Sequence, residues 1–206
     1  MTMASASDAP LLGTLYLDVE TTGVGSFRPP TQRLLQLAWI LDSTGPVRET
    51  SHLISDVDSD VSPHVPHDIT IEKCRKTGVP FDAAFDALLA DLRLCGTVVA
   101  HNLDFDWGTL LNELRLRGRP ASDLTAAAEP AVKLCTMKST TGLCRLPKAG
   151  TRFTGFKYPT LRELHVKVVG GEPAERLHDA LNDCRVLRRC HVALRASYRL
   201  AELGCK

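Results

Sequence analysis

Four acidic residues occur where a folded chain could bring their carboxylates together. Asp18 and Glu20 are two residues apart in an alternating apolar run, so on a strand they share one face, with Cα atoms about 6–7 Å apart. Asp106 follows the apolar run 98–100, and Asp183 lies at the edge of the apolar stripe of a predicted helix, where an unpaired carboxylate is costly. Carboxylate oxygens suit Mg²⁺ or Mn²⁺. The four acids together therefore predict a site for two divalent metal ions.

A histidine accompanies these acids, because His178 precedes Asp183 by five residues. Two ions about 4 Å apart can clamp the attacking and leaving oxygens of a phosphodiester, and a neutral histidine can take the proton of the attacking water. The sequence contains neither GxxxxGK[ST] nor GxGxxG, which this chemistry does not need. Each feature alone also has a structural reading: a solvated strand face, a helix-capping aspartate, or a surface histidine.

The elements that would carry these residues follow from hydrophobic periodicity. Strands are expected over 14–20, 34–41, 49–54, 98–100 and 132–137, and helices over 81–94, 104–117, 159–169 and 179–201. Residues 138–157 are expected to be irregular, and Asp104 and Asp179 are expected to cap helices. This order predicts an α/β fold with a mixed sheet, antiparallel at first and then parallel. We expect a single domain over 1–206, with residues 1–12 as a disordered N-terminus.

The composition excludes several classes of protein. The 206 residues are 44% hydrophobic and 24% charged, as in globular proteins, and the net charge of +1 argues against a broadly basic nucleic-acid coat. Aromatic residues make up 5%, too few for a long base-stacking platform. No apolar run is long enough to cross a membrane. The seven cysteines lack metal-site spacing and predict free thiols in an intracellular, reducing compartment, cytoplasm or nucleus.

One segment departs from this balance, because residues 133–167 contain eight basic residues against one acidic residue, a net charge of +7. Basic groups neutralise phosphates and aromatic rings stack on bases. We hypothesise that this segment guides a single strand toward the carboxylates; the alternative is a solvated loop pinned by its aromatic residues. The candidate guiding residues are Lys138, Arg145, Lys148, Arg152, Phe153, Phe156, Lys157 and Tyr158.

The three acidic segments resemble the motifs of the DEDDh, or DnaQ-like, 3′–5′ exonuclease family of the ribonuclease H-like fold. Residues 17–23 (LDVETTG) resemble its first motif, residues 99–106 (VAHNLDFD) its second, and His178-x₄-Asp183 its third in the histidine form. Residues 67–70 and 78–81 resemble two further segments, with Asp68 in place of the usual glycine. The resemblance covers residues 14 to about 195.

The resemblance implies a ribonuclease H-like, mixed five-stranded sheet flanked by helices, and a two-metal exonuclease that releases nucleoside 5′-monophosphates. It implies that Asp18, Glu20 and Asp183 hold the ion that carries the attacking water. Asp18 and Asp106 would hold the second ion, and His178 would be the general base. Residues expected to contact the terminal nucleotide are Thr21, Thr22, His101, Asn102, Leu103 and Phe105.

The implied partner is single-stranded DNA or RNA with a free 3′ end, with DNA slightly favoured, and a homodimer is compatible with the family. Two alternatives stay open. One is an exoribonuclease that trims RNA 3′ ends. The other is a non-catalytic nucleic-acid-binding or proofreading-associated module on the same fold.

Overall fold

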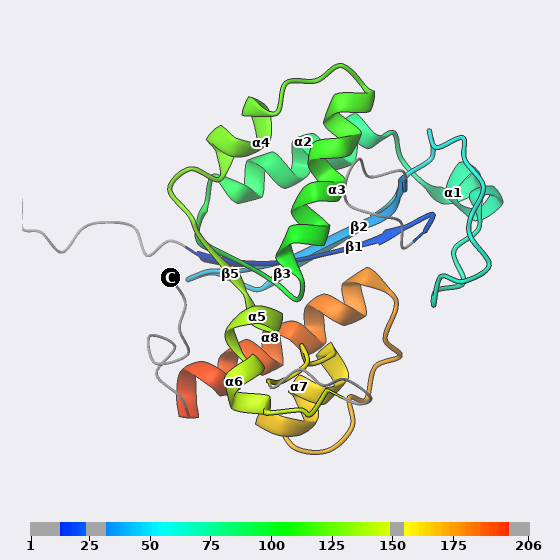
Figure 1. Ribbon diagram of the computed structural model, residues 1–206. Coiled ribbons are helices and arrows are strands. Elements are labelled where there is room, and N and C mark those ends of the chain that lie inside the picture. Colours follow the sequence, from blue (N-terminus) through cyan, green and yellow to red (C-terminus); the bar gives the residue numbers. More distant parts are fainter. Residues whose placement is uncertain (1–12, 24–31, 149–154, 198–206) are drawn as a thin grey trace, which may run out of the picture.

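The computed structural model describes residues 13–23, 32–148 and 155–197, in which a central sheet separates two layers of helices (Figure 1). The strands are β1 (Gly13–Thr21), β2 (Leu34–Asp42), β3 (Arg48–Leu53), β4 (Cys95–Ala100) and β5 (Val132–Cys135). The helices are α1 (Ile71–Thr77), α2 (Phe81–Leu92), α3 (Leu103–Leu116), α4 (Ser122–Ala127), α5 (Thr136–Ser139), α6 (Thr141–Cys144), α7 (Leu161–Val168) and α8 (Ala180–Ser197). Helices α2 to α4 lie on one side of the sheet and α5 to α8 on the other (Figure 1).

The sheet has the strand order β3-β2-β1-β4-β5, with β1 at its centre. Strand β1 pairs antiparallel with β2, which pairs antiparallel with β3, whereas β1–β4 and β4–β5 are parallel pairs. The expected mixed, five-stranded sheet is therefore confirmed. The central position of β1 places Asp18 and Glu20 between the two parts of the sheet.

The alternation of β1 divides the apolar side chains between two cores. Leu15, Leu17 and Val19 join the core under α2 and α3, whereas Tyr16 joins the core under α7 and α8. Successive strand side chains point to opposite faces, so the odd-numbered residues fill one core and the even-numbered residues face the other. Asp18 and Glu20 consequently face the layer that contains α8, the helix that carries Asp183.

Four short helices were not expected from the sequence. Helix α1 begins after Thr70, whose hydroxyl accepts a hydrogen bond from the Lys73 amide, and α4 begins after a proline-containing turn. Helices α5 and α6 form in the segment expected to be irregular, and α5 replaces the end of the strand expected to reach residue 137. Helices of four to seven residues leave little periodicity in a sequence, which is why periodicity did not reveal them.

Some expectations fall on residues that the structure does not describe. The expected disordered terminus, 1–12, lies outside the described residues, as do the last residues of the helix expected to reach 201. None of the described helices is long and apolar enough to cross a membrane.

Candidate active site

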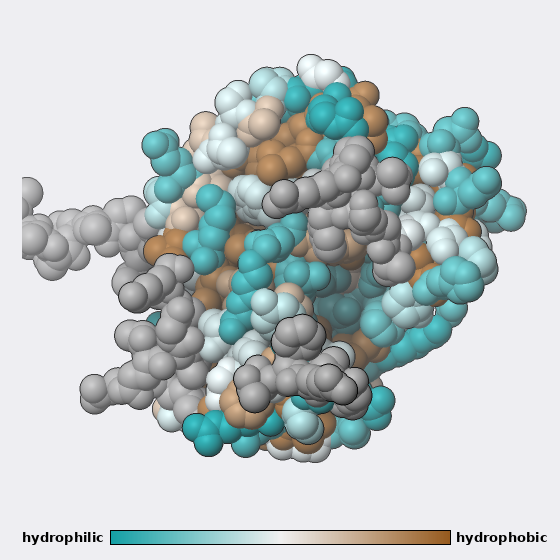
Figure 2. Space-filling view, viewed as in Figure 1, coloured by the Kyte–Doolittle hydropathy of each residue, from teal (hydrophilic) through white to brown (hydrophobic). Residues whose placement is uncertain are grey.

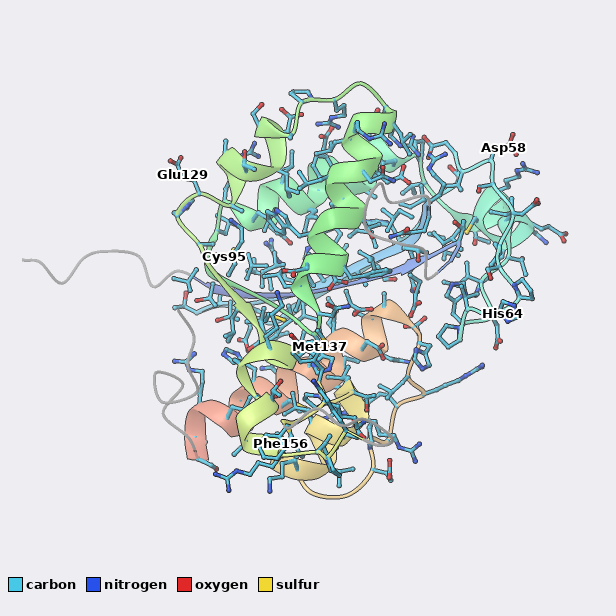
Figure 3. The ribbon with its side chains drawn as sticks, viewed as in Figure 1. Asp58, His64, Cys95, Glu129, Met137 and Phe156 are labelled. Atoms are coloured by element: carbon cyan, nitrogen blue, oxygen red, sulfur yellow. The ribbon has the colours of Figure 1, made fainter. Side chains whose placement is uncertain are left out.

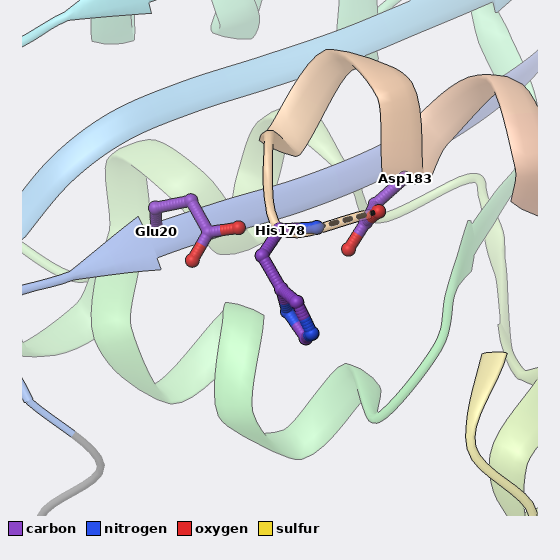
Figure 4. A group of neighbouring side chains, drawn as sticks. All are labelled: Glu20, His178 and Asp183. Atoms are coloured by element: carbon purple, nitrogen blue, oxygen red, sulfur yellow. Dashed lines mark hydrogen bonds between the residues drawn. The ribbon is translucent and has the colours of Figure 1, made fainter. Parts of the chain in front are cut away.

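Three side chains from two distant parts of the chain meet at the end of β1. One ligand atom from each of Glu20, His178 and Asp183 lies within 4.8 Å of the others. Glu20 is near the end of β1, Asp183 is in the first turn of α8, and His178 lies between them in the segment that enters α8 (Figure 4). The backbone amide of His178 donates to Oδ1 of Asp183 at 3.2 Å. The structure thus brings together three of the residues that the sequence indicates as site residues.

The backbone of His178 is in a conformation that L-residues rarely adopt, with φ of 68°. A residue without glycine's freedom keeps this conformation only where the surrounding structure enforces it. Here the bond to Asp183 and the start of α8 fix the backbone, which presents the imidazole beside the carboxylates.

The other two acids share the electrostatic environment of Glu20 and Asp183. Burial, followed by the charges of Asp106, Asp183 and Glu20, raises the pKa of Asp18 well above its ordinary value. Burial is likewise the main cause that raises the pKa of Asp106, with Glu20 and Asp183 adding to it. The pKa rises to about 8 for Glu20 and about 7 for Asp183, again chiefly through burial. The four carboxylates thus form a cluster in which each charge opposes the others.

This cluster fits divalent metal ions. All four acids offer oxygen ligands, which hard cations such as Mg²⁺ and Mn²⁺ prefer, and a cation among them would relieve the repulsion that raises their pKa values. Glu20 and Asp183, with His178, are close enough to share one ion as they stand. Asp18 and Asp106 are not part of that group of three, although their charges act on it.

A glutamine that the sequence analysis missed positions the helix that carries Asp183. Gln36 on β2 accepts a hydrogen bond from the amide of Ala180 at 3.1 Å and donates to Oδ2 of Asp179 at 3.2 Å. Asp179 in turn caps α8, since its Oδ1 accepts from the amide of Asn182 at 3.1 Å. The predicted capping role of Asp179 is confirmed. The available signal for Gln36 was a polar residue within an apolar strand, which needs a buried partner.

A buried histidine fixes the turn after β1. The Nδ1 atom of His67 accepts from the amide of Ile69 at 3.2 Å, so its Nε2 carries the proton and donates to the carbonyl oxygen of Thr21 at 2.8 Å. The hydroxyl of Thr21 donates to Gly23, and the Thr22 hydroxyl accepts from the amide of Arg33. Both threonines are buried and shape this turn; their contact with a terminal nucleotide stays a prediction.

The second predicted motif lies at the junction of β4 and α3. Both ring nitrogens of His101 are engaged, Nδ1 with the Thr136 hydroxyl and Nε2 with the Pro159 carbonyl, each at 3.0 Å. Burial lowers the pKa of His101 to about 4, so the ring is a neutral link between α3 and the segment before α7. Asn102 precedes α3 with φ of 89°. Leu103 is buried and Phe105 is half-buried, and their roles toward substrate stay predictions.

The expectation that Asp104 caps this helix is wrong. Asn102 occupies the cap position, and Asp104 lies within the first turn of α3, where it pairs with Nζ of Lys138 at 2.5 Å. The helix begins one residue earlier than the periodicity indicated, because Leu103 packs into the core as its first residue.

Several of the predicted guiding residues have partners inside the protein. Lys138 pairs with Asp104, and Lys157 binds both oxygens of Glu163 at 2.6 and 2.8 Å. Phe156 and Tyr158 are exposed, Phe156 in the layer of helices α5 to α8 (Figure 3). Arg145 and Lys148 are also exposed, whereas Arg152 and Phe153 lie outside the described residues. The charge that this segment offers to a strand is therefore smaller than its net charge of +7, and its guiding role stays a prediction.

A cavity of about 880 Å³ opens beside the acidic cluster. It is lined by Pro66, by Thr160 and the first residues of α7 (161–163), by residues 172–173 and 175–178, and by Asp183. The face shown in Figure 2 is hollowed between the two helix layers, and hydrophilic side chains lie within the hollow. Because His178 and Asp183 belong to its lining, a molecule bound in the cavity would contact these two residues of the cluster.

No protein-family model and no curated protein matches the chain. Solved structures do. Exonuclease I of E. coli in complex with a dA16 oligonucleotide matches with a TM-score of 0.63 and 19% identity over 93% of this chain and 42% of that one. The complex with a dT13 oligonucleotide gives a TM-score of 0.64 and 20% identity, with the same coverage.

A moderately thermophilic exonuclease I from Methylocaldum szegediense matches with a TM-score of 0.65 and 19% identity, over 90% of this chain and 41% of that one. The chain thus spans about two fifths of the length of these structures. The similarity extends over nearly the whole chain and shows that its mixed sheet and flanking helices have the ribonuclease H-like fold found in exonuclease I.

Proposed function

We propose that this protein is a metal-dependent 3′–5′ exonuclease that hydrolyses single-stranded nucleic acid, with DNA favoured, and releases nucleoside 5′-monophosphates. The observation that supports this most is the convergence of Glu20, His178 and Asp183 to within 4.8 Å, next to Asp18 and Asp106, in a fold shared with exonuclease I. A purely structural role does not explain why the four acids lie together. Without a bound cation, four mutually repelling carboxylates beside a cavity destabilise the fold.

Each residue of the cluster has a role in this proposal. Asp18, Glu20, Asp106 and Asp183 would hold two Mg²⁺ or Mn²⁺ ions. Such ions, when bound, supply an activated water and neutralise the charge that develops on the reacting oxygens. His178 would accept the proton of the attacking water. Burial, together with the charges of His67 and Arg176, lowers the pKa of His178, which keeps its imidazole in the neutral form that a general base needs.

The preference for DNA is supported by the solved structures. Exonuclease I of E. coli was crystallised with dA16 and dT13 oligonucleotides, and its zinc-bound form was crystallised as a complex with single-stranded DNA. Discrimination against RNA depends on how the pocket receives a 2′-hydroxyl group. Trimming of RNA 3′ ends is the second candidate, and parallel assays on the two substrates decide between them.

Two further expectations are kept as proposals. The described cysteines Cys74, Cys95, Cys135, Cys144, Cys184 and Cys190 are all free thiols, which supports a reducing, intracellular setting. Assembly as a homodimer rests on the resemblance alone.

The experiment is a degradation assay on single-stranded DNA and RNA labelled at the 5′ end, with Mg²⁺ or Mn²⁺. The wild type is compared with Asp18→Asn and with the matched control Asp58→Asn, whose exposed carboxylate lies beside α1, away from the cluster (Figure 3). We expect a ladder of products shortened from the 3′ end by the wild type and the control, and none by Asp18→Asn. Equal degradation by all three proteins would refute the mechanism. Binding without degradation by the wild type would favour the non-catalytic module.

A further inference from the structure

An exposed ion pair joins two segments that border the cavity beside the acidic cluster. The guanidinium of Arg176 lies 2.5 Å from Oδ2 of Asp68, and both side chains are about three-quarters exposed, at 75% and 74%. Asp68 follows His67, which is fixed to Thr21 at the end of β1, and Arg176 is two residues before His178. The pair therefore connects the segment that contains His67 to the segment that enters α8.

Any strand that reaches the cluster meets an electrostatic obstacle. Each nucleotide carries a negative phosphate, and the proposed centre contains four carboxylates. Two arginines, Arg162 and Arg176, line the described part of the cavity. Arg162 pairs with Glu172, and both of these residues line the cavity.

Arg176 is the better placed of the two arginines for a substrate phosphate. It lines the cavity two residues before His178, whose pKa is lowered by burial first and then by the charges of His67 and Arg176. Its partner Asp68 is exposed, and exposed ion pairs contribute little to stability, so another anion can replace the carboxylate readily. A guanidinium suits this exchange, because its planar set of donors matches a phosphate as well as a carboxylate.

We propose that the guanidinium of Arg176 binds a backbone phosphate of the single strand. In the free protein the carboxylate of Asp68 pairs with this guanidinium, and the phosphate displaces it when the strand binds. The proposal rests on the proposed function and identifies a residue that recognises its substrate. Asp68 stands where the exonuclease family that the sequence resembles usually has glycine, so the competing carboxylate is a feature of this chain. Because the strand must displace Asp68, it binds more weakly than it would to an unpaired arginine. The affinity for the strand also depends on the salt concentration.

The test measures binding rather than hydrolysis. A 5′-fluorescein-labelled oligo(dT) is titrated with protein by fluorescence anisotropy over a series of NaCl concentrations, first in EDTA and then with Ca²⁺ in place of Mg²⁺. The variants are Arg176→Gln and Asp68→Asn. The matched control is Arg75→Gln, which removes an exposed arginine that is also paired with an exposed aspartate, Asp58, outside the cavity.

Arg176→Gln should weaken binding several-fold and reduce the slope of log K against log[NaCl] by about 0.7, the value for one phosphate contact to a single strand. Asp68→Asn should tighten binding, since no carboxylate then competes with the phosphate. Arg75→Gln should leave both quantities unchanged. Circular dichroism establishes that the variants are folded, as their exposed positions lead us to expect.

An unchanged Kd and salt slope for Arg176→Gln would overturn the proposal, as would an equal loss for Arg75→Gln. Weaker binding by Asp68→Asn would overturn the exchange, because it would mean that Asp68 only orients the arginine. Failure of the wild type to bind the oligonucleotide in either buffer would also overturn the proposal. A wild type that binds as described and degrades nothing would refute the proposed function and leave the role of Arg176 standing.

Discussion

Gln36 lies directly opposite Glu20 in the antiparallel pairing of β2 with β1, and it also binds the first turn of α8. One buried side chain thus connects β2, the neighbour of the strand that carries Asp18 and Glu20, to the helix that carries Asp183. The three acids Asp18, Glu20 and Asp183 are therefore not held in place by their own elements alone. The hydrogen bonds of Gln36 add to the packing of α8 on β1 and β2 in holding the two parts of the cluster together.

Gln36→Leu should therefore reduce both stability and activity. The substitution removes three hydrogen bonds, and it leaves the amide of Ala180 and one oxygen of Asp179 without their partner. Leaving buried polar groups unsatisfied costs about 1–3 kcal/mol, which urea denaturation would measure. Ser51→Ala is the control, because Ser51 bonds to Gln36 but not to α8. Equal stability of the wild type and Gln36→Leu would contradict this account of how α8 is positioned.

The stability of the metal-free protein should fall as the pH rises from about 4 to about 8. The folded-state pKa values of Glu20 and Asp183, about 8 and about 7, lie above the ordinary values of 4.5 and 3.8. Between these limits the folded chain keeps protons that the unfolded chain has released, so the free energy of unfolding falls with pH. The decline is at most about 1.4 kcal/mol per pH unit for each group. Thermal unfolding in EDTA across this pH range measures the decline. A stability that rises with pH would contradict the prediction.

Divalent ions should reverse that decline. A cation bound among the carboxylates favours their charged forms, so the increase in Tm on adding Mg²⁺ or Mn²⁺ should be larger at pH 8 than at pH 5. Asp183→Asn should reduce the increase, whereas Asp58→Asn, far from the cluster, should not. An increase of the same size in Asp183→Asn would show that the ions bind elsewhere.

Asp106→Asn should separate activity from stability. Asp106 is 2% exposed, and its charge adds to the repulsion within the cluster. Removing that charge should raise the Tm of the metal-free protein at pH 8 while reducing exonuclease activity about 100-fold or more. Loss of both stability and activity would instead indicate a structural role for this residue. The two readouts come from one preparation, by differential scanning fluorimetry and the degradation assay.

His178→Gln should lower kcat by about 10²–10⁴-fold, the usual contribution of a general base. Because the pKa of His178 is lowered, the wild-type rate should rise with pH through a midpoint below about 6.5, the ordinary histidine value. The residual rate of His178→Gln should lack that dependence. An unchanged pH profile in the variant would assign the base to another group.

Local patterns were enough to predict the parts of the fold that carry the chemistry. The alternation around Asp18 and Glu20 predicted the strand and the face of that strand that the two carboxylates share. The motif spacing predicted that Asp183 would lie in the same site, and in the structure it lies close to Glu20. The contacts that hold these parts in register could not be predicted in the same way. Gln36 and Asp179 are 143 residues apart, and no local pattern links two such positions.

The same limit explains the incorrect expectation for Asp104. An aspartate near the start of a helix favours the cap position in any sequence. Here Leu103 is buried in the core, so the helix begins at Leu103. Asp104 forms an ion pair with Lys138 of α5. Tertiary packing thus decided between two local arrangements that the sequence allowed equally.

The first product released from the 3′ end shows whether the protein is a metal-dependent 3′–5′ exonuclease. Single-stranded DNA with a radiolabelled 3′-terminal nucleotide is incubated with the wild type in Mg²⁺ and in EDTA, and the first labelled product is identified by chromatography. We expect the label to appear at once as a nucleoside 5′-monophosphate, and only when Mg²⁺ is present. The proposed function would be refuted by a first labelled product that is an oligonucleotide or a 3′-monophosphate. Release of the same labelled product in EDTA would also refute it.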